Sequence, residues 1–421
     1  MLFALVDCNN FYVSCERVFD ARLRHRAVIV LSNNDGCVVA RSNEAKKLGI
    51  KMGIPVFQVR NIIDANQIKV LSSNYPLYGD MSRRVMNALS EFSSHMEIYS
   101  VDEAFLEIEE SPRAGELDSF GRNLKASIYR QTGIPVSVGV AATKTLAKLA
   151  NYLAKESSKA GGVLDLSNSM HLDRALERTP VEEVWGIGSQ SAKLLKANQI
   201  ETALEFRNAD PAWVEQQLTI SGRHVLQELL GIPCIRFHAT VPIRKSMTVS
   251  RSFGSQIHEL KDMRAAVAQF LTRAGEKLRR NALSASVLTI FVATNRFAKQ
   301  SPQYSNSIKV KLSLSTNQTS ELIEHGMPAL ESIFREGYSY KKAGITLTGI
   351  VQSAEVNRDL LDNRRSSRSC QLSDTLDRIN RLYGQDLVHY GVVRKHRHWR
   401  PKSEQRSPQY TTDWGELFTV S

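Results

Sequence analysis

Three carboxylates stand at positions where they could hold divalent metal ions. Asp7 ends a short apolar run, and Asp102 and Glu103 lie at a turn between two predicted strands. Carboxylates at the ends of adjacent strands can converge, and hard cations such as Mg²⁺ prefer oxygen ligands. Two such ions, about 3.5–4 Å apart, can activate an attacking oxygen and stabilise a leaving one. Acids at strand ends are also ordinary turn residues, and taken alone this plainer interpretation is favoured.

A predicted helix from Thr143 to Lys155 carries three lysines on one face. Lys144, Lys148 and Lys155 are spaced four and seven residues apart, away from the apolar stripe of this helix. Fixed positive charges on such a face could hold a triphosphate. For this helix alone, a solvated lysine face is the default interpretation.

Two aromatic residues and a glycine hairpin could contact a nucleotide and a nucleic acid. Phe11 and Tyr12 follow Asp7 closely and could form the wall of a sugar pocket, although one of them is expected in the core. The sequence Gly186-Ile187-Gly188 precedes a predicted helix that carries Lys193 and Lys196. A hairpin of this kind points backbone N–H groups outward and can bind phosphates without reading sequence.

The elements that must position these residues change in type along the chain. The first 168 residues alternate strand and helix patterns, which predicts an α/β domain around a mixed sheet. Residues 169–235 are helix-rich, and 236–245 form a linker. Residues 246–353 have the order β-α-β-β-α-β. The polar tail from 354 to 421 breaks into short pieces.

Composition argues against a membrane-spanning protein, a secreted protein and a zinc-finger protein. The chain has 421 residues and a formal charge of +12, and it has no apolar run that approaches the ~20 residues of a membrane span. Its five cysteines are scattered and have no metal-site spacing, which is typical of reduced thiols in the cytosol. Between positions 246 and 350 there are 14 Lys or Arg against 7 Asp or Glu. This local excess indicates a polyanionic partner.

Taken together and in this order, the motifs resemble the Y-family of translesion DNA polymerases. The sequences of these motifs are similar to those of the bacterial UmuC subfamily, which supplies the catalytic subunit of DNA polymerase V. The resemblance covers nearly the whole chain and is highly specific as a set. Its residues are Asp7–Glu16, Leu31–Cys37, Ser72–Tyr75, Tyr99–Phe105, Lys144–Asn151, Val184–Gly188, Ser250–Gly254 and Tyr410–Thr412.

The resemblance implies an α/β multidomain right hand. It has an α/β palm with small fingers, an all-α thumb with a helix-hairpin-helix, a βαββαβ little finger and an extended C-terminal tail. The implied boundaries are 1–20 and 78–168 for the palm, 21–77 for the fingers, 169–235 for the thumb, 236–245 for the linker, 246–353 for the DNA-binding little finger and 354–421 for a partner-binding tail.

The resemblance also assigns roles to residues in the palm. Asp7, Asp102 and Glu103 would be catalytic and would hold two Mg²⁺ ions, with the Cys8 carbonyl joining them. Tyr12 matches the steric gate, whose ring clashes with the 2′-hydroxyl of a ribonucleotide.

Further residues would contact the nucleotide or the DNA. Phe11 is the neighbour of the steric gate, and Lys155 matches the lysine that contacts the triphosphate. Many family members grip the triphosphate with a fingers tyrosine and arginine, whereas this chain has Asn43 and Lys46. Lys46 can still supply charge, and Arg41 can compensate. The implied DNA contacts are Gly186, Ile187, Gly188, Lys193 and Arg251.

The implied activity is error-prone DNA synthesis opposite damaged template in the SOS response of a bacterial cytoplasm. Primer–template DNA and deoxynucleoside triphosphates would be the substrates. Partners would be a processed accessory UmuD-type dimer, a RecA filament and a sliding clamp. The nearest clamp-binding stretch, Asn357–Leu361, lacks the glutamine and the phenylalanine of that motif, so a plain polar tether is an equal interpretation.

Two other functions remain open at the level of the residues. A palm-type nucleotide cyclase would explain the acids and the lysines, but it would not need the hairpin or the basic domain. A non-catalytic DNA-binding scaffold would explain the charge, but it would leave the acids without a role.

Overall fold

The structure, a computed structural model, divides the chain into two compact units. Unit 1 comprises Met1–Val241 and Glu404–Ser421, and unit 2 comprises Pro242–Ser403. The residues that it describes are 2–108, 115–167, 169–237, 244–298, 300–356, 367–384, 386–393 and 399–417. Within these ranges no helix is both long and apolar enough to cross a membrane.

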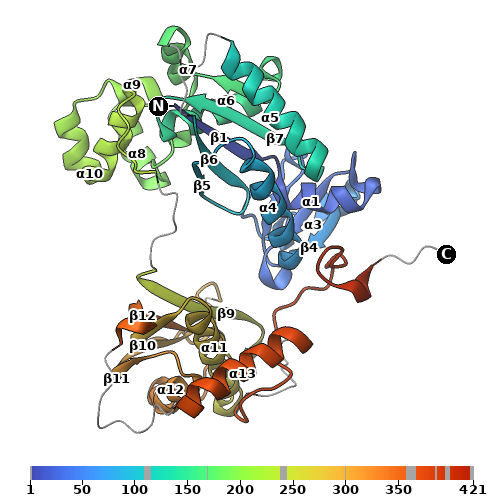
Figure 1. Ribbon diagram of the computed structural model, residues 1–421, viewed down its shortest axis with the longest axis vertical. Coiled ribbons are helices and arrows are strands. Elements are labelled where there is room, and N and C mark those ends of the chain that lie inside the picture. Colours follow the sequence, from blue (N-terminus) through green and yellow to red (C-terminus); the bar gives the residue numbers. More distant parts are fainter. Residues whose placement is uncertain are drawn as a thin grey trace. The chain divides into compact units, whose positions relative to one another are not determined.

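A five-stranded sheet forms the centre of unit 1, in the order β5-β6-β1-β7-β8 (Figure 1). Its middle strand, β1 (Leu2–Cys8), is almost fully buried, as its continuous apolar run requires. Antiparallel neighbours lie on both sides of it, β6 (Glu103–Ile108) and β7 (Val136–Ala141). The edges are β5 (Met96–Ile98) and β8 (Val163–Asp165).

Alternate residues of β1 pack into two different cores. Ala4 and Val6 face a core built with α1, α4 and α5. Phe3 and Leu5 face a second core, built with α6 and the helical region that follows it. The bounds of these helices are Phe11–Phe19 for α1, Tyr75–Leu89 for α4, Glu116–Thr132 for α5 and Lys144–Glu156 for α6.

The helix α6 lies unusually close to the sheet because β7 contains a glycine. A Cβ built on Gly139 would lie 2.2 Å from the Asn151 nitrogen and 2.4 Å from the Ala147 oxygen. Only a residue without a side chain therefore fits between β7 and the helix backbone. This close approach fixes where the lysines of α6 stand above the sheet.

A small second sheet, in the order β3-β2-β4, occupies the region predicted as fingers. Its central strand is parallel to β4 and antiparallel to β3, and it is buried along its length. Short helices and a separate small core complete the region. The bounds are Val28–Leu31 for β2, Val38–Arg41 for β3, Asn43–Lys47 for α2, Arg60–Ala65 for α3 and Lys69–Ser72 for β4.

The region predicted as an all-helical thumb is helical in the structure. It holds α7 (Leu172–Arg178), α8 (Ser189–Ala197), α9 (Ala203–Arg207) and α10 (Pro211–Leu229). These helices bury their apolar faces in the core that they share with α6.

Unit 2 has the predicted β-α-β-β-α-β order. Its four antiparallel strands stand in the order β11-β10-β12-β9, and α11 and α12 cover one face of the sheet (Figure 1). The bounds are Ser246–Ile257 for β9, Leu260–Arg280 for α11, Leu283–Thr294 for β10, Ser305–Thr316 for β11, Thr319–Ile333 for α12 and Tyr340–Gln352 for β12.

The stretch predicted as one tail is divided between the two units. Its helix α13 (Ser367–Tyr383) belongs to unit 2, where Asp377 forms an ion pair of 2.7 Å with Arg279. Trp399 is 3% exposed and packs beside Phe253 and Phe270 of unit 2. From Glu404 onward the chain belongs to unit 1 instead.

Candidate active site

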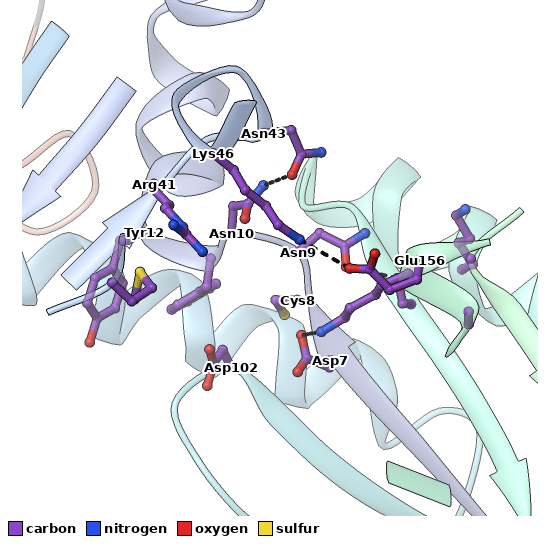
Figure 2. A pocket seen from close by; sticks show the side chains of 18 of the residues that line it. Asp7, Cys8, Asn9, Asn10, Tyr12, Arg41, Asn43, Lys46, Asp102 and Glu156 are labelled. Carbon is purple, nitrogen blue, oxygen red and sulfur yellow. Dashed lines mark hydrogen bonds and ion pairs between the residues drawn. The ribbon is translucent and has the colours of Figure 1, made fainter. Parts of the chain in front are cut away.

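A cavity of about 800 Å³ opens beside the carboxyl end of β1 (Figure 2). Asp7 and Asp102 lie on one side of it, and Arg41 and Lys46 lie on the other. The cavity is therefore lined by acids from the central sheet and by bases from the small sheet region. Other predicted site residues in its lining are Cys8, Phe11, Tyr12 and Lys155.

Backbone pairing brings the three predicted acids together, although they are about a hundred residues apart in sequence. Asp7 stands opposite Glu103 in the antiparallel register of β1 and β6. The Cys8 N–H donates to the Asp102 carbonyl at 2.8 Å. The Asp102 carboxylate accepts a hydrogen bond from the Ser100 hydroxyl at 2.5 Å. The turn is thus held directly against the end of β1.

Each of the other two acids has a lysine partner from α6. Lys155 contacts Asp7 at 2.6 Å, and Lys148 contacts Glu103 at 3.1 Å. Burial raises the pKa of Asp7; Lys155 opposes this rise, and the negative charge of Asp102 adds to it. Burial likewise raises the pKa of Glu103, against the effect of Lys148. The site therefore concentrates negative charge that needs cations.

The donor set fits a hard divalent cation. Three carboxylates and the Cys8 carbonyl offer oxygen ligands, and burial raises the pKa of the Cys8 thiol well above its usual range, so the sulfur stays protonated. Among the described residues, no group of three or more His, Cys, Asp or Glu side chains is arranged so that it could hold a metal ion. Asp7 and Glu103 instead contact the ammonium groups of Lys155 and Lys148.

The three lysines of α6 have different surroundings, contrary to the prediction of one phosphate-binding face. Lys144 is 1% exposed, forms an ion pair with Glu97 at 2.5 Å and donates to the Arg236 carbonyl at 2.8 Å. Its role is therefore structural. Lys148 lies over the ring of Tyr99, and of the three only Lys155 lines the cavity.

Phe11 and Tyr12 divide the roles predicted for an aromatic pair. The helix α1 begins after Asn10, which has a left-handed backbone with φ of 47°. Phe11 is 3% exposed and belongs to the core, Tyr12 is half-buried, and both border the cavity. The Tyr12 ring stacks on Tyr78 at 4.3 Å with an interplanar angle of 13°.

The residues that replace the expected fingers pair both reach the cavity. Asn43 accepts a hydrogen bond from Asn10 at 3.1 Å, and Lys46 forms an exposed ion pair with Glu156 at 3.1 Å (Figure 2). The Arg41 guanidinium donates to the Ile50 carbonyl. Arg41 and Lys46 therefore keep positive charge at the rim opposite the acids.

The glycine hairpin is partly a packing device. Gly186 has φ of 98°, and a Cβ there would lie 2.7 Å from Val225, so a glycine is required. Ile187 is 7% exposed and packs into the core. Gly188 precedes α8 directly, and Lys193 on this helix is exposed. The start of α8 and Lys193 are thus exposed, whereas Ile187 is buried.

The sheet face of unit 2 away from its helices carries small polar side chains and lysines. Lys309 and Lys311 are exposed on β11, opposite Thr289 and Val287 of β10. The hydroxyls of Thr248 and Thr346 are 2.9 Å apart on the same face. We call this surface, made of Thr248, Thr289, Lys309, Lys311 and Thr346, the open face.

Arg251 does not belong to the open face. Strand alternation places it on the helix side, with the buried Val249. There it lines a cavity of about 420 Å³ with Gln269, Arg273 and Trp399. The predicted DNA contact Arg251 thus lies on the helix side of the sheet, apart from the open face.

Several side-chain contacts near the predicted acids escaped prediction from sequence. Lys148, Tyr99 and Trp185 form a cation–π cluster, and Trp185 donates to the Tyr99 hydroxyl at 3.2 Å. Tyr78 supports Tyr12 from another helix. The motifs that contain Tyr99 and Trp185 were visible, but their contact joins residues 86 apart in the chain.

Solved structures with this fold are Y-family DNA polymerases. A chimera of the Y-family polymerases Dbh and Dpo4 has a TM-score of 0.67 at 20% identity, covering 83% of this chain and 99% of its own. An insertion ternary complex of Dbh DNA polymerase has a TM-score of 0.54 at 19% identity, with the same coverage of both chains. The right-hand fold predicted from the sequence is thereby confirmed.

The chain belongs to the impB/mucB/samB family. The family matches residues 6–152, its C-terminal domain matches 244–360, and a domain of unknown function matches 371–420. The protein UmuC of Salmonella typhimurium is 38% identical over all of both chains, and the protein SamB of the same organism is 40% identical over 99% of both. The predicted UmuC-type membership and translesion DNA polymerase class are confirmed. The Y-family polymerase fold of this chain implies the use of divalent metal ions.

Proposed function

We propose that the cavity beside β1 adds deoxynucleotides to a primer 3′-OH opposite damaged template during the SOS response. The convergence of Asp7, Asp102 and Lys155 on one open cavity is the observation that carries this proposal. The 3′ oxygen forms a bond to the α-phosphorus, and the bond to the β-phosphate breaks, so pyrophosphate leaves. Little covalent chemistry is required of the protein, and catalysis is mostly positioning and electrostatics.

The acids of the central sheet are the proposed metal ligands. Asp7, Asp102 and Glu103, with the Cys8 carbonyl, would hold two Mg²⁺ ions, which lower the pKa of the 3′-OH and neutralise the leaving group. The raised pKa of Asp7 and of Glu103 supports this role, because burying negative charge favours binding of a cation. Both acids already contact the ammonium groups of lysines, which are the cations available in the protein itself.

Basic residues on two elements would hold the triphosphate. Lys155 contacts Asp7 and lines the cavity, so its ammonium group can move to a phosphate once Asp7 has another cationic partner. Arg41 and Lys46 approach from the opposite rim (Figure 2). Because Lys46 cannot make the bidentate contact of an arginine, this grip depends on point charge.

Tyr12 would exclude ribonucleotides and Phe11 would support it. Both residues border the cavity, and Phe11 is the more deeply buried of the two. A 2′-hydroxyl would meet the fixed ring, and this repulsion discriminates between the two sugars.

The predicted domains would divide the work of holding DNA. The five-stranded sheet region serves as palm, the β3-β2-β4 region as fingers, the helical region as thumb and unit 2 as little finger, within the boundaries predicted above. The start of α8 at Gly188 with Lys193, and the open face with Lys309 and Lys311, would contact phosphates. Binding should therefore be insensitive to base sequence and should weaken steeply with salt.

Protein partners in the bacterial cytoplasm complete the proposal. They are a processed accessory UmuD-type dimer, a RecA filament and, with a degenerate motif, a sliding clamp. The clamp stretch Asn357–Leu361 lies outside the described residues.

Primer extension across an abasic template tests the proposal. The chain is assayed with its accessory partners, and wild type is compared with Asp7→Ala. We expect Mg²⁺-dependent extension by wild type and none by the variant at equal folding. Normal extension by Asp7→Ala would overturn the ligand assignment. Incubation with nucleotides and no DNA separates a cyclase, which would release a cyclic product, and a scaffold would extend no primer.

A further inference from the structure

The C-terminal residues 404–417, which we call the C-terminal segment, contact α1, which carries the predicted steric gate, and the start of α4. The Tyr410 ring stacks on Phe19 of α1 at 4.8 Å with an interplanar angle of 9°. The Ser72 N–H at the end of β4 donates to the Gln405 carbonyl at 3.0 Å. The segment is thus fixed to the palm and the fingers regions by both ring and backbone contacts.

Ser407 is the most deeply placed residue of this segment. It is 9% exposed, and its hydroxyl donates to Glu16 at 2.9 Å. Asn74, which caps the start of α4, donates to the Ser407 hydroxyl at 2.9 Å and to its carbonyl at 3.0 Å. One serine therefore contacts both α1 and α4.

Glu16 joins Ser407 to the aromatic stack beneath the cavity. It is 2% exposed and accepts a second hydrogen bond, at 2.7 Å, from the Tyr78 hydroxyl. The Tyr78 ring stacks on Tyr12. A continuous path of contacts thus runs from Ser407 through Glu16 and Tyr78 to Tyr12.

Helical spacing places the same contacts on one face of α1. Tyr12, Glu16 and Phe19 are four and three residues apart, so they lie along one side of the helix. Ser407 and Tyr410 contact two of these residues. The third, Tyr12, stands at the cavity end of the same face. A segment bound along this face can set how far α1 and α4 stand apart.

The network has little freedom to rearrange without loss. A buried carboxyl group that loses one of its two hydroxyl partners must recruit water or move. A change in the position of the Glu16 carboxylate would also move the Tyr78 hydroxyl, which donates a hydrogen bond to it. Because Tyr12 rests on the Tyr78 ring, its distance from the sugar position would change as well.

We propose that Ser407, Glu16 and Tyr78 are positioning residues for Tyr12, and that the C-terminal segment thereby sets the sugar specificity of the polymerase. This inference rests on the proposed gate role of Tyr12. It gives a task to the end of the domain of unknown function that matches residues 371–420.

Single-nucleotide insertion kinetics test this inference on the full chain with its accessory partners. The selectivity is the ratio of kcat/KM for dCTP to kcat/KM for CTP opposite a template guanine. Ser407→Ala should lower this ratio by roughly threefold to tenfold, chiefly because CTP insertion rises. Ser407→Thr, which keeps the hydroxyl, should restore the ratio. Ser403→Ala, an exposed serine four residues earlier, is the matched control and should equal wild type.

Tyr12→Ala separates failure of this inference from failure of the gate assignment. An unchanged ratio in Tyr12→Ala would overturn the gate and the proposed sugar pocket with it. A collapsed ratio in Tyr12→Ala with a wild-type ratio in Ser407→Ala would overturn only the positioning role. Adding Ser407→Ala to Tyr12→Ala should cost no further selectivity, because both act through one ring.

A merely structural role predicts a different pattern. It would lower dCTP and CTP insertion equally and leave the ratio unchanged, which would also overturn the inference. If Ser407→Ala does not fold, Tyr78→Phe removes the other hydroxyl and keeps the ring stack. We expect the same loss of selectivity from it, and a wild-type ratio in Tyr78→Phe would count against the network.

Discussion

The cavity of unit 1 and the open face of unit 2 both carry charge, but they hold it differently. In the cavity lining, the side chain of Asp7 is 21% exposed, and that of Glu103, opposite Asp7 on β6, is 12% exposed; each contacts a lysine from α6. Lys309 and Lys311 of unit 2 are exposed on a sheet face of small hydroxyl residues. Charge that is buried depends on exact placement, whereas charge that is exposed is nearly interchangeable. We therefore expect single substitutions to matter greatly in the cavity and little on the open face.

The largest effect should come from a carboxylate at the cavity. Asp102→Asn keeps the size of the side chain but removes its charge, so we expect primer extension to fall at least ~10³-fold. Asp118→Asn is the matched control, because Asp118 forms an exposed ion pair with Arg122 on α5. Steady-state extension rates measure both. Equal extension rates in Asp102→Asn and Asp118→Asn would contradict the expectation that a carboxylate at the cavity matters more than an exposed one.

The second effect concerns the scaffold under the cavity. Gly139→Ala would push a Cβ into the backbone of α6, which cannot turn away as a side chain can. We expect a loss of about 3 kcal/mol in the free energy of unfolding, at the upper end for overpacking. Gly188→Ala, with no atom within 4 Å of the added Cβ, is the control. Denaturant unfolding measures the difference, and similar stability of both variants would contradict the close approach.

The third effect lies on the open face. The double change Lys309→Ala and Lys311→Ala should weaken binding to primer–template DNA several-fold and reduce the slope of log affinity against log salt by about 2. Arg251→Ala should change the slope less, because Arg251 lies on the helix side of the sheet. Fluorescence anisotropy at several salt concentrations gives both slopes. A larger change from Arg251 would reverse our placement of the DNA surface.

The smallest effect is a pH dependence of the response to Mg²⁺. The raised pKa of Asp7 and of Glu103 means that their protonated forms stabilise the fold at low pH, and that this contribution is lost as pH rises through those values. Mg²⁺ competes with more bound protons at pH 5 than at pH 7, so it should raise Tm by a few degrees more at pH 7.

Asp7→Asn is the control for this measurement, and its Tm should respond weakly to Mg²⁺ at both pH values. A response in the wild-type chain that is equal at pH 5 and pH 7 would argue that neither acid binds the ion.

Features of the fold that local periodicity encodes were predictable from the sequence, whereas the surroundings of individual side chains were not. Long amphipathic helices such as α4 and α5 and the β-α-β-β-α-β order were predictable because local periodicity encodes them. The lysines of α6 were not, because the sequence shows their shared face but not what covers it. Lys144 is enclosed by Glu97 and the Arg236 carbonyl, and Lys155 borders the cavity. The burial of tail residues was not predictable for a related reason. The polar composition of the tail gives no sign that Ser407 and Trp399 are buried.

The sequence by itself determined the kinds of element, their order and the chemical types in the site, since these depend on local pattern and residue identity. Only the tertiary structure decided which partner each charged group has, such as Lys148 for Glu103, and that Ser407 reaches Glu16 from 391 positions away. The physical reason is that burial and pairing energies depend on distances through space, which spacing along the chain does not fix.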